Sequence, residues 1–347
     1  MAVYYCGVLA SIMIYLTIDL FKKKKSFIKL FLSLLPLLII SAIRYDVGWD
    51  YIDIYTNGFI MIGKGYMPYY FSEKPFDYLV KIIYNLSNAN PNVLFIVCSI
   101  ITFIFLSLAI RDQSKNVVLS IIFLFMIRYY FLTLNIVRQG IAMSILLYSL
   151  KYLKEKKYKR YILFVLLASC FHQLSLIYIP LIYVYNINFK KKKSYALILI
   201  YGLMVAVAFF LIMKYTKYGK YVNSKFNGHQ LLIHELILET VLLFMCFYNK
   251  KNINFNEGYE KIYLMFLLIS FIVSSLSFVI PVADRITWYF YLTDIFLIPI
   301  LINKTKNRKE KMLFLVVLFT ITSITIYMQT AIGDSYSILP YKTIFNK

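Results

Sequence analysis

Arginine is the residue type whose placement in this chain points most directly to chemistry. The sequence contains 31 lysines but only seven arginines. Four of the seven fall at the predicted outer ends of membrane segments: Arg44, Arg128, Arg138 and Arg285. A guanidinium stays charged, presents a planar fork of N–H donors and tolerates partial burial better than an ammonium. Arginines from separate segments therefore predict a site for a polyanion such as pyrophosphate. Ion pairing between helices, for example of Arg285 with Asp294, is the alternative.

Carboxylates and aromatic rings alternate in the polar stretch that follows Arg44. Asp46 and Asp50 are four residues apart, as are Tyr51 and Tyr55, so each pair would share one face of a helix. With Trp49, these rings could stack on the apolar face of a sugar while the carboxylates accept its hydroxyl protons. Either aspartate could serve as a general base or orient the attacking hydroxyl. A belt of aromatic residues at the membrane surface, with solvated acids, is the alternative.

Ionisable residues inside apolar segments form a second group of candidates, because such residues are costly in a bilayer and are often functional. Glu235 and Glu239 are four residues apart near the end of one segment, and Asp294 lies inside another. These acids could bind substrate, transfer protons or pair with the arginines. His172 could donate to a phosphate or move a proton, or it could be structural. No zinc, P-loop or dinucleotide motif occurs, so the predicted chemistry needs neither a metal nor a cofactor.

The composition shows which elements must position these residues. The chain of 347 residues is 61% hydrophobic and only 16% charged, whereas a soluble domain carries about 25% charged residues. This excludes a water-soluble enzyme. Continuous apolar runs, rather than alternating segments of about ten residues, favour transmembrane helices over a membrane barrel.

The formal net charge of +22 is distributed in short basic clusters between apolar runs. The clusters lie at 22–25, 154–160, 190–193, 250–251 and 304–311. This is the positive-inside pattern of cytoplasmic loops, so nucleic acid is excluded as a partner and the lipid bilayer is predicted. The four cysteines lie in or beside apolar runs and are expected to be small core residues.

Apolar segments long enough to cross a bilayer recur along the chain. The predicted spans are 3–20, 27–43, 93–110, 117–134, 136–153, 195–213, 231–248, 262–280, 286–302 and 312–330. A further apolar stretch from Tyr161 to Phe189 is too short for two crossings and has basic clusters at both ends. We expect a broken, re-entrant hairpin there, with a turn near His172 and a break at Pro180.

The fold predicted from these segments is all-α: a polytopic helical membrane protein with about 11 transmembrane helices plus the hairpin. We expect one transmembrane domain over residues 1–347, with both termini and a long exoplasmic loop, 44–92, on the outer side. The arginines and the aspartates then share that side.

Three motifs resemble the EpsG family of exopolysaccharide polymerases, which are related in role to the Wzy polymerases of O-antigen and capsule. The first is Arg44-x-Asp-Val-Gly-x-Asp50-Tyr51, followed by Tyr55 and Phe59. The others are Arg138-Gln139 at the head of a span and Phe171-His172 in the hairpin, with a weaker match at Pro340-Tyr341. The resemblance implies a GT-C-like membrane glycosyltransferase that uses sugars linked to polyprenyl pyrophosphate.

The resemblance also implies the surroundings and the roles of the residues. The enzyme would sit in the bacterial cytoplasmic (inner) membrane, active site facing outward, with a flippase and a chain-length regulator as partner proteins. Asp46, Asp50, Arg138 and His172 would be catalytic. Substrate would be bound by Arg44, Gln139, Trp49, Tyr51 and Tyr55. Arg128, Arg285 and Glu239 match no family motif, and we assign them to substrate from their residue types and positions alone. A flippase or transporter of lipid-linked oligosaccharide is the main alternative, although the sequence lacks the two similar halves of many transporters; an acyltransferase is another.

Overall fold

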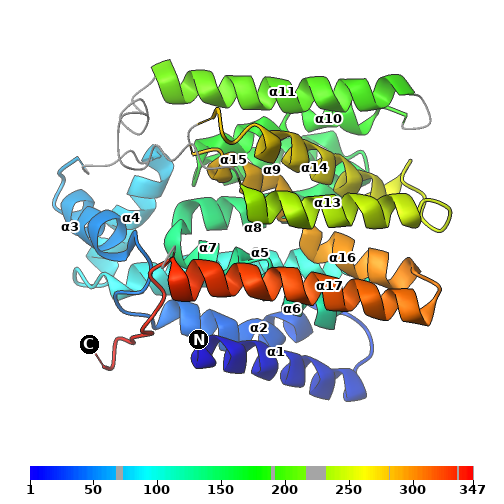
Figure 1. The fold of residues 1–347 in the computed structure, drawn as a ribbon. Helices are drawn as coiled ribbons and strands as arrows, with labels where there is room; N and C mark the ends of the chain where they lie inside the picture. The colour runs from blue at the N-terminus through cyan, green and yellow to red at the C-terminus, as the bar shows by residue number, and fades with distance from the viewer. Residues whose placement is uncertain (68–72, 189–191, 216–231, 281, 334–335, 347) are drawn as a thin grey trace. The chain divides into compact units, whose positions relative to one another are not determined.

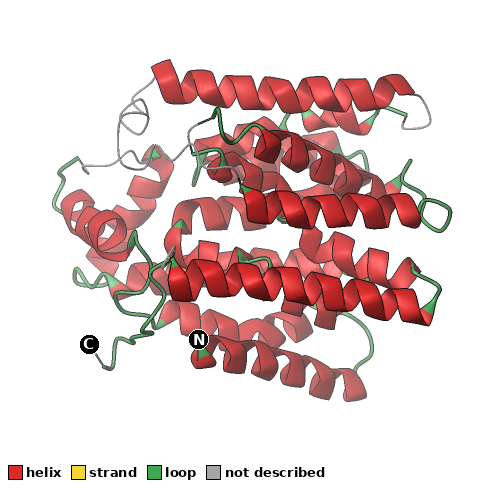
Figure 2. Ribbon diagram, viewed as in Figure 1, coloured by secondary structure: helices red, strands yellow, loops and turns green. Residues whose placement is uncertain are grey.

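Helices make up all of the regular structure in the described part of the chain. The computed structural model describes every residue except 68–72, 189–191, 216–231, 281, 334–335 and 347. The described residues form no strand (Figure 2). The all-helical class predicted from composition is therefore confirmed.

The chain divides into two compact units. The first comprises Met1–Ser149, Arg160–Leu176 and Ile326–Lys347, and the second comprises Leu150–Lys159 and Ile177–Thr325. Elements of the first unit are α1 (Ala2–Phe21), α2 (Phe27–Ala42), η1 (Tyr51–Thr56), α3 (Asn57–Gly63), α4 (Lys74–Leu86), α5 (Asn92–Gln113), α6 (Val117–Met126), α7 (Tyr129–Asn135), most of α8 (Val137–Lys154) and of α9 (Tyr158–Ser169), and η3 (Met328–Ile332). Elements of the second unit are α10 (Leu181–Tyr185), α11 (Lys192–Tyr215), α13 (Ile233–Tyr248), α14 (Gly258–Ser275), α15 (Asp284–Tyr291), α16 (Asp294–Lys304) and nearly all of α17 (Arg308–Tyr327).

Five helices of the described chain are long and apolar enough to cross a membrane, or up to seven spans if each of two bent pairs counts as one. The bent pairs are α6 with α7, at 53°, and α15 with α16, at 44°. This supports a polytopic helical membrane protein, with fewer long spans than the predicted count of about 11. Part of the difference lies in α2 and α13, which have only 16 residues each, short of the roughly 20 needed to cross the hydrocarbon core. The predicted span at 136–153 is helical as α8 but is not among the helices that are long and apolar enough.

In the first unit, α2 packs against both α1 and α5 (Figure 1). The hydroxyls of Ser41 and Ser99 lie 2.8 Å apart between α2 and α5. Small hydroxyl residues of this kind let apolar helices approach closely and satisfy each other's polar atoms.

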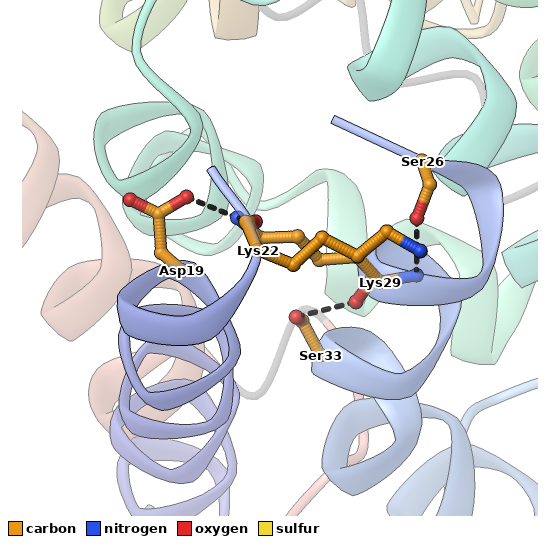
Figure 3. Close-up of polar contacts among 5 residues, drawn as sticks. All are labelled: Asp19, Lys22, Ser26, Lys29 and Ser33. Atoms are coloured by element: carbon orange, nitrogen blue, oxygen red, sulfur yellow. Dashed lines mark hydrogen bonds and ion pairs between the residues drawn. The ribbon is translucent and has the colours of Figure 1, made fainter. Parts of the chain in front are cut away.

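Lys29 fixes the start of α2 against the end of α1 (Figure 3). Its ammonium is almost fully buried, forms an ion pair with Asp19 of α1, and donates to the Lys22 carbonyl oxygen at 3.1 Å. It also lies 4.4 Å from the ring centre of Tyr15. Ser26 caps the helix by accepting the Lys29 N–H. A buried cation is tolerated only with such partners, so the turn between α1 and α2 is defined by side chains.

The predicted exoplasmic loop, 44–92, is largely helical. It contains the π-helix η1 and the α-helices α3 and α4, which pack on one another. The hydrogen bond from the Tyr55 N–H to the Asp50 carbonyl has the five-residue spacing of a π-turn. Such widened turns occur often at functional sites.

The predicted hairpin is interrupted where the sequence indicates. Helix α9 ends at Ser169, residues 170–172 are non-helical, and the 3₁₀-helix η2 (Gln173–Tyr178) follows. Pro180 then precedes the short helix α10. The end of the predicted hairpin at Phe189 and the start of the basic cluster at 190–193 lie outside the described residues. That the hairpin enters and leaves from one side remains a prediction.

In the second unit, α14 is the central helix. It packs against α11, α13, α15 and α16, and it is mostly buried. The Tyr178 hydroxyl donates to the Tyr289 carbonyl oxygen, and its ring packs edge-on against Phe266 of α14. Aromatic packing of this kind, in which the tyrosine hydroxyl also forms a hydrogen bond, holds the end of η2 against α15.

Candidate active site

The junction between α7 and α8 gathers the predicted motif residues of the first unit. The loop of residues 44–49 lies against it: the Asn135 side chain accepts the Trp49 N–H at 2.7 Å. Gly48 has a φ of 106°, and a Cβ at this position would lie 2.6 Å from the Leu134 carbonyl oxygen. Only glycine allows both this backbone conformation and so close an approach.

Arg44 lies at the centre of this contact and is 1% exposed. Its guanidinium donates to the carbonyl oxygens of Val47 and Leu134, each at 3.2 Å, and to that of Ser41. It also lies 4.8 Å from the ring centre of Phe95. These donors are already engaged by the chain, so the geometry favours a role in shaping the loop over direct contact with an anion.

Tyr51 and Tyr55 share one face of η1, as their spacing predicts. Both pack against Phe95, and Tyr51 stacks on it with 4.1 Å between ring centres. The Tyr55 hydroxyl accepts the Arg138 N–H at 3.2 Å, and burial raises the pKa of Tyr55 to about 12. Both tyrosines are therefore buried supports. Trp49, by contrast, is 55% exposed.

Arg138 connects the head of α8 to the segment around α4. Its Nη1 lies 2.5 Å from Glu73 Oε2, and the two side chains are only 13% and 7% exposed. The other Glu73 oxygen accepts the Gln173 N–H at 3.2 Å, immediately after His172. A single carboxylate thus brings together Arg138, the 44–92 segment and the turn of the predicted hairpin.

The neighbours of this ion pair are aromatic and polar. The Arg138 guanidinium lies 5.8 Å from the ring centre of Phe76, which packs against Phe171 at 6.3 Å between ring centres. Gln139 is buried, and His172 is half-buried. Two of the three predicted motifs, Arg138-Gln139 and Phe171-His172, are therefore close to each other in the fold.

Arg128 lies at the break between α6 and α7. It is buried and has a φ of 67°, a left-handed backbone conformation that residues other than glycine rarely adopt. Its Nη1 donates to the Gln329 side-chain oxygen in η3, which also accepts the Tyr336 hydroxyl at 3.1 Å. Unusual backbone held in this way often marks functional sites.

The two predicted catalytic aspartates are more accessible. Asp46 has a φ of 50°, and its carboxylate, about half exposed, lies 3.6 Å from the Lys342 ammonium. Asp50 is half-buried and precedes η1. Both carboxylates lie on the loop that contacts the α7–α8 junction.

The C-terminal segment completes this loop. Backbone N–H groups of Tyr45 and Gly48 donate to the carbonyl oxygens of Lys342 and Ser337, at 3.0 and 2.8 Å. The Tyr341 hydroxyl donates to the Ile40 carbonyl at 2.8 Å. This contact includes the Pro340-Tyr341 motif noted in the sequence.

The second unit contains the other predicted residues. Arg285 is half-buried, with its guanidinium 5.9 Å from the ring centre of Trp288. Glu239 is fully buried and accepts hydrogen bonds from the hydroxyls of Ser270 and Ser274. Among the described residues, neither carboxylate oxygen of the buried Asp294 has a hydrogen-bond partner. The convergence of Arg285 with the arginines of the first unit remains a prediction.

Two residues of this site were not identified from the sequence. Glu73 follows a stretch without motif and looks like a solvated acid, although it precedes Pro75 at the start of a helix. Gln329 lies in an apolar segment and carries no charge. Only the fold brings them to Arg138 and Arg128. Across the described residues, no group of three or more His, Cys, Asp or Glu side chains is placed to hold a metal ion.

Comparison with known proteins identifies the family of the chain. Searches of curated proteins and of solved structures gave no match. A sequence profile of the EpsG family, whose members are exopolysaccharide polymerase-like, matches residues 27–343. This range includes every motif residue described above. Because the match covers nearly the whole chain, the chain belongs to the EpsG family.

Proposed function

We propose that the chain is a membrane glycosyltransferase that joins oligosaccharide repeat units carried on polyprenyl pyrophosphate. The reaction would take place at the outer face of the bacterial cytoplasmic membrane. One observation carries the proposal beyond the family's polymerase-like function: the Glu73 carboxylate joins Arg138, the 44–92 segment and the turn after His172.

The proposed reaction transfers the growing glycan from its lipid carrier to a new lipid-linked unit. A hydroxyl oxygen of the acceptor sugar attacks the anomeric carbon of the glycan. The new C–O bond forms as the bond from that carbon to the pyrophosphate oxygen breaks. The hydroxyl proton passes to a carboxylate, and polyprenyl pyrophosphate leaves as an anion.

Positioned cations would supply most of the catalysis, because they are fixed where negative charge develops on the leaving group. We assign this role to Arg138 and Arg128. Glu73 positions Arg138, since both of its oxygens accept hydrogen bonds. Arg44 holds the loop in place.

The remaining residues would act on the sugars and on the proton. Asp46 or Asp50 is the general base or orients the attacking hydroxyl, and Trp49 contacts the acceptor. His172 supports the phosphate or carries a proton. Gln139 is proposed to line the substrate path, and the buried Tyr51 and Tyr55 fix the loop that carries Trp49.

The direct test uses purified protein in detergent with lipid-linked repeat units and no ion gradient. A polymerase should produce longer glycans, which gel electrophoresis resolves, whereas a transporter should leave glycan length unchanged. A flippase and a chain-length regulator would act before and after this step, so neither is required in the assay. Absence of any elongation by folded protein would overturn the proposal in favour of transport.

A second test examines the arginine clamp. Arg138→Lys keeps the positive charge but loses the planar fork of donors, so the protein should fold while polymerisation falls by at least about tenfold. Retained glycan length in this variant would contradict the role assigned to Arg138. The proposal also includes metal independence, so added EDTA should leave the rate unchanged.

A further inference from the structure

A cavity of about 590 Å³ opens at the turn between α16 and α17 in the second unit. Three cationic side chains line it: Lys306, Arg308 and Lys311. Within the described chain, none of the three has a carboxylate at ion-pair distance. Glu310, which lies among them in sequence, accepts the Tyr248 hydroxyl of α13. The positive charge of the cavity is thus not balanced by an ion pair.

The turn that carries these cations is held by hydrogen bonds. Thr305 is buried; its hydroxyl donates to the Leu301 carbonyl oxygen at 2.9 Å and accepts the Asn249 side-chain N–H at 3.2 Å. The Asn307 side chain accepts the Lys309 N–H at 2.9 Å, at the start of α17. The N-terminus of a 20-residue helix adds partial positive charge at the same place. The hydrogen bonds and the helix N-terminus thus fix a region of positive charge beside the cavity.

The other side of the cavity is apolar. Met312 and Leu315 of α17 line it, and Met312 is 57% exposed. Because α17 begins one of the candidate membrane spans, these two side chains lie just inside the predicted hydrocarbon region. The cavity thus combines cations at the membrane boundary with an apolar wall beyond it.

We propose that this cavity binds an anionic phospholipid of the leaflet on the predicted cytoplasmic side, where the basic clusters lie. The headgroup phosphate would lie between the three cations, and an acyl chain would follow Met312 and Leu315. Basic pockets between membrane helices bind anionic headgroups in this way. The positive-inside rule accounts for a basic loop at this position, but it requires neither a cavity nor an apolar wall.

Native mass spectrometry of the full-length protein with added phosphatidylglycerol tests the proposal. The triple variant K306Q/R308Q/K311Q should bind the lipid at least about tenfold more weakly than the wild type, since each basic residue near a membrane adds several-fold to binding. The matched control K22Q/K23Q/K24Q removes the same charge from another exposed basic turn. It should change binding less than about twofold. Size-exclusion chromatography checks that both variants are folded.

A second variant separates a lipid from a free phosphate compound. M312Q/L315Q keeps all three cations but removes the apolar wall, so it should weaken phosphatidylglycerol binding as well. Soluble glycerol 3-phosphate should not bind to any form of the protein. Equal loss in the pocket and control variants would overturn the proposal, as would unchanged binding in M312Q/L315Q. Preferential displacement of phosphatidylglycerol by polyprenyl phosphate would also overturn it, because the site would then serve the sugar carrier. None of these readouts depends on glycosyl transfer.

Discussion

At the scale of single residues, Arg138 and Glu73 form the contact on which the proposed chemistry depends most. Glu73→Gln keeps the shape of the side chain but removes its charge. Loss of one partner from a buried ion pair costs about 3–5 kcal/mol, so the guanidinium should shift and polymerisation should fall by at least about tenfold. The rate of glycan elongation in detergent measures this effect.

An exposed ion pair elsewhere in the chain supplies the control. Glu155 lies 2.7 Å from the Lys157 ammonium, and both side chains are more than one-third exposed. Exposed pairs contribute little to stability, so Glu155→Gln should leave elongation unchanged. Equal activity in the two variants would show that Glu73 does not position Arg138.

Gly48 allows a second prediction at this scale. Gly48→Ala would place a Cβ against the Leu134 carbonyl oxygen, and a strained backbone of this kind costs about 1–3 kcal/mol. Gly65 also has a positive φ, of 86°, but no atom lies within 4 Å of a Cβ at that position. We therefore expect Gly48→Ala to lower the thermal midpoint and the activity more than Gly65→Ala does.

The two glycine variants differ mainly in the close contact, since both adopt unfavourable backbone conformations. A similar loss of thermal stability and activity in both variants would show that the positive φ alone, without the close contact, causes the effect. The approach of the loop to the α7–α8 junction would then be less tight than the hydrogen bond from Trp49 to Asn135 indicates.

Some of the site could be predicted from residue spacing, and some could not. Arg138, Tyr51 and Tyr55 were identified because their types and spacing are unusual for an apolar chain. The same reasoning could not distinguish Arg44 from Arg138, because sequence gives the charge but not the partners. Arg44 donates to backbone carbonyl oxygens, whereas Arg138 pairs with the carboxylate of Glu73.

At the scale of elements, hydropathy located the helices well but not their breaks. Each predicted span that lies in the described chain coincides with a helix or a bent pair. The break at Arg128 was not predicted, because the run from 117 to 134 is apolar enough on average to be taken as one span despite Arg128. A left-handed residue there depends on contacts from η3, over 200 residues later in the chain, and local hydropathy contains no information about such contacts.

The link between η3 and the break gives a prediction at this scale. Gln329→Leu removes the oxygen that accepts from Arg128, and losing a hydrogen bond to a charged group costs about 1.5–3 kcal/mol. Elongation should therefore fall by about tenfold or more. Tyr336→Phe removes only the second donor to Gln329 and should have a smaller effect.

The comparison of these two variants distinguishes two functions of Gln329. If Tyr336→Phe reduces elongation as much as Gln329→Leu does, the glutamine mainly anchors the C-terminal segment. If only Gln329→Leu is impaired, its contact with Arg128 is the one that matters. The thermal midpoint of each variant separates loss of stability from loss of activity.

At the scale of the whole molecule, the distribution of charge predicts how the chain lies in the membrane. The basic clusters should face the cytoplasm and the 44–92 segment should face outward. Single cysteines can be placed at Lys64, in that segment, and at Lys251, after α13, in a chain whose four native cysteines are replaced by serine. A membrane-impermeant thiol reagent on intact cells should label the first position only.

Labelling of Lys251→Cys but not Lys64→Cys would reverse the orientation and place Arg138 on the cytoplasmic side. Lysing the cells before labelling provides the control, because both positions are exposed and should then react. The sequence predicted the all-helical membrane class because composition indicates a membrane protein and continuous apolar runs indicate helices. The packing of helices within each unit could not be predicted, since it depends on contacts between segments that are distant in the sequence.

The contact between the two ends of the first unit has a consequence for biosynthesis. The Tyr341 hydroxyl bonds to the Ile40 carbonyl, 301 residues earlier. At a translation rate of about 5–20 residues per second, Ile40 leaves the ribosome roughly 15–60 s before Tyr341 does. The loop with Asp46 and Asp50 must therefore remain incomplete while the helices insert. A nascent chain that has reached only Ile326 would therefore hold its helices without the backbone contacts from Ser337 and Lys342 that fix this loop.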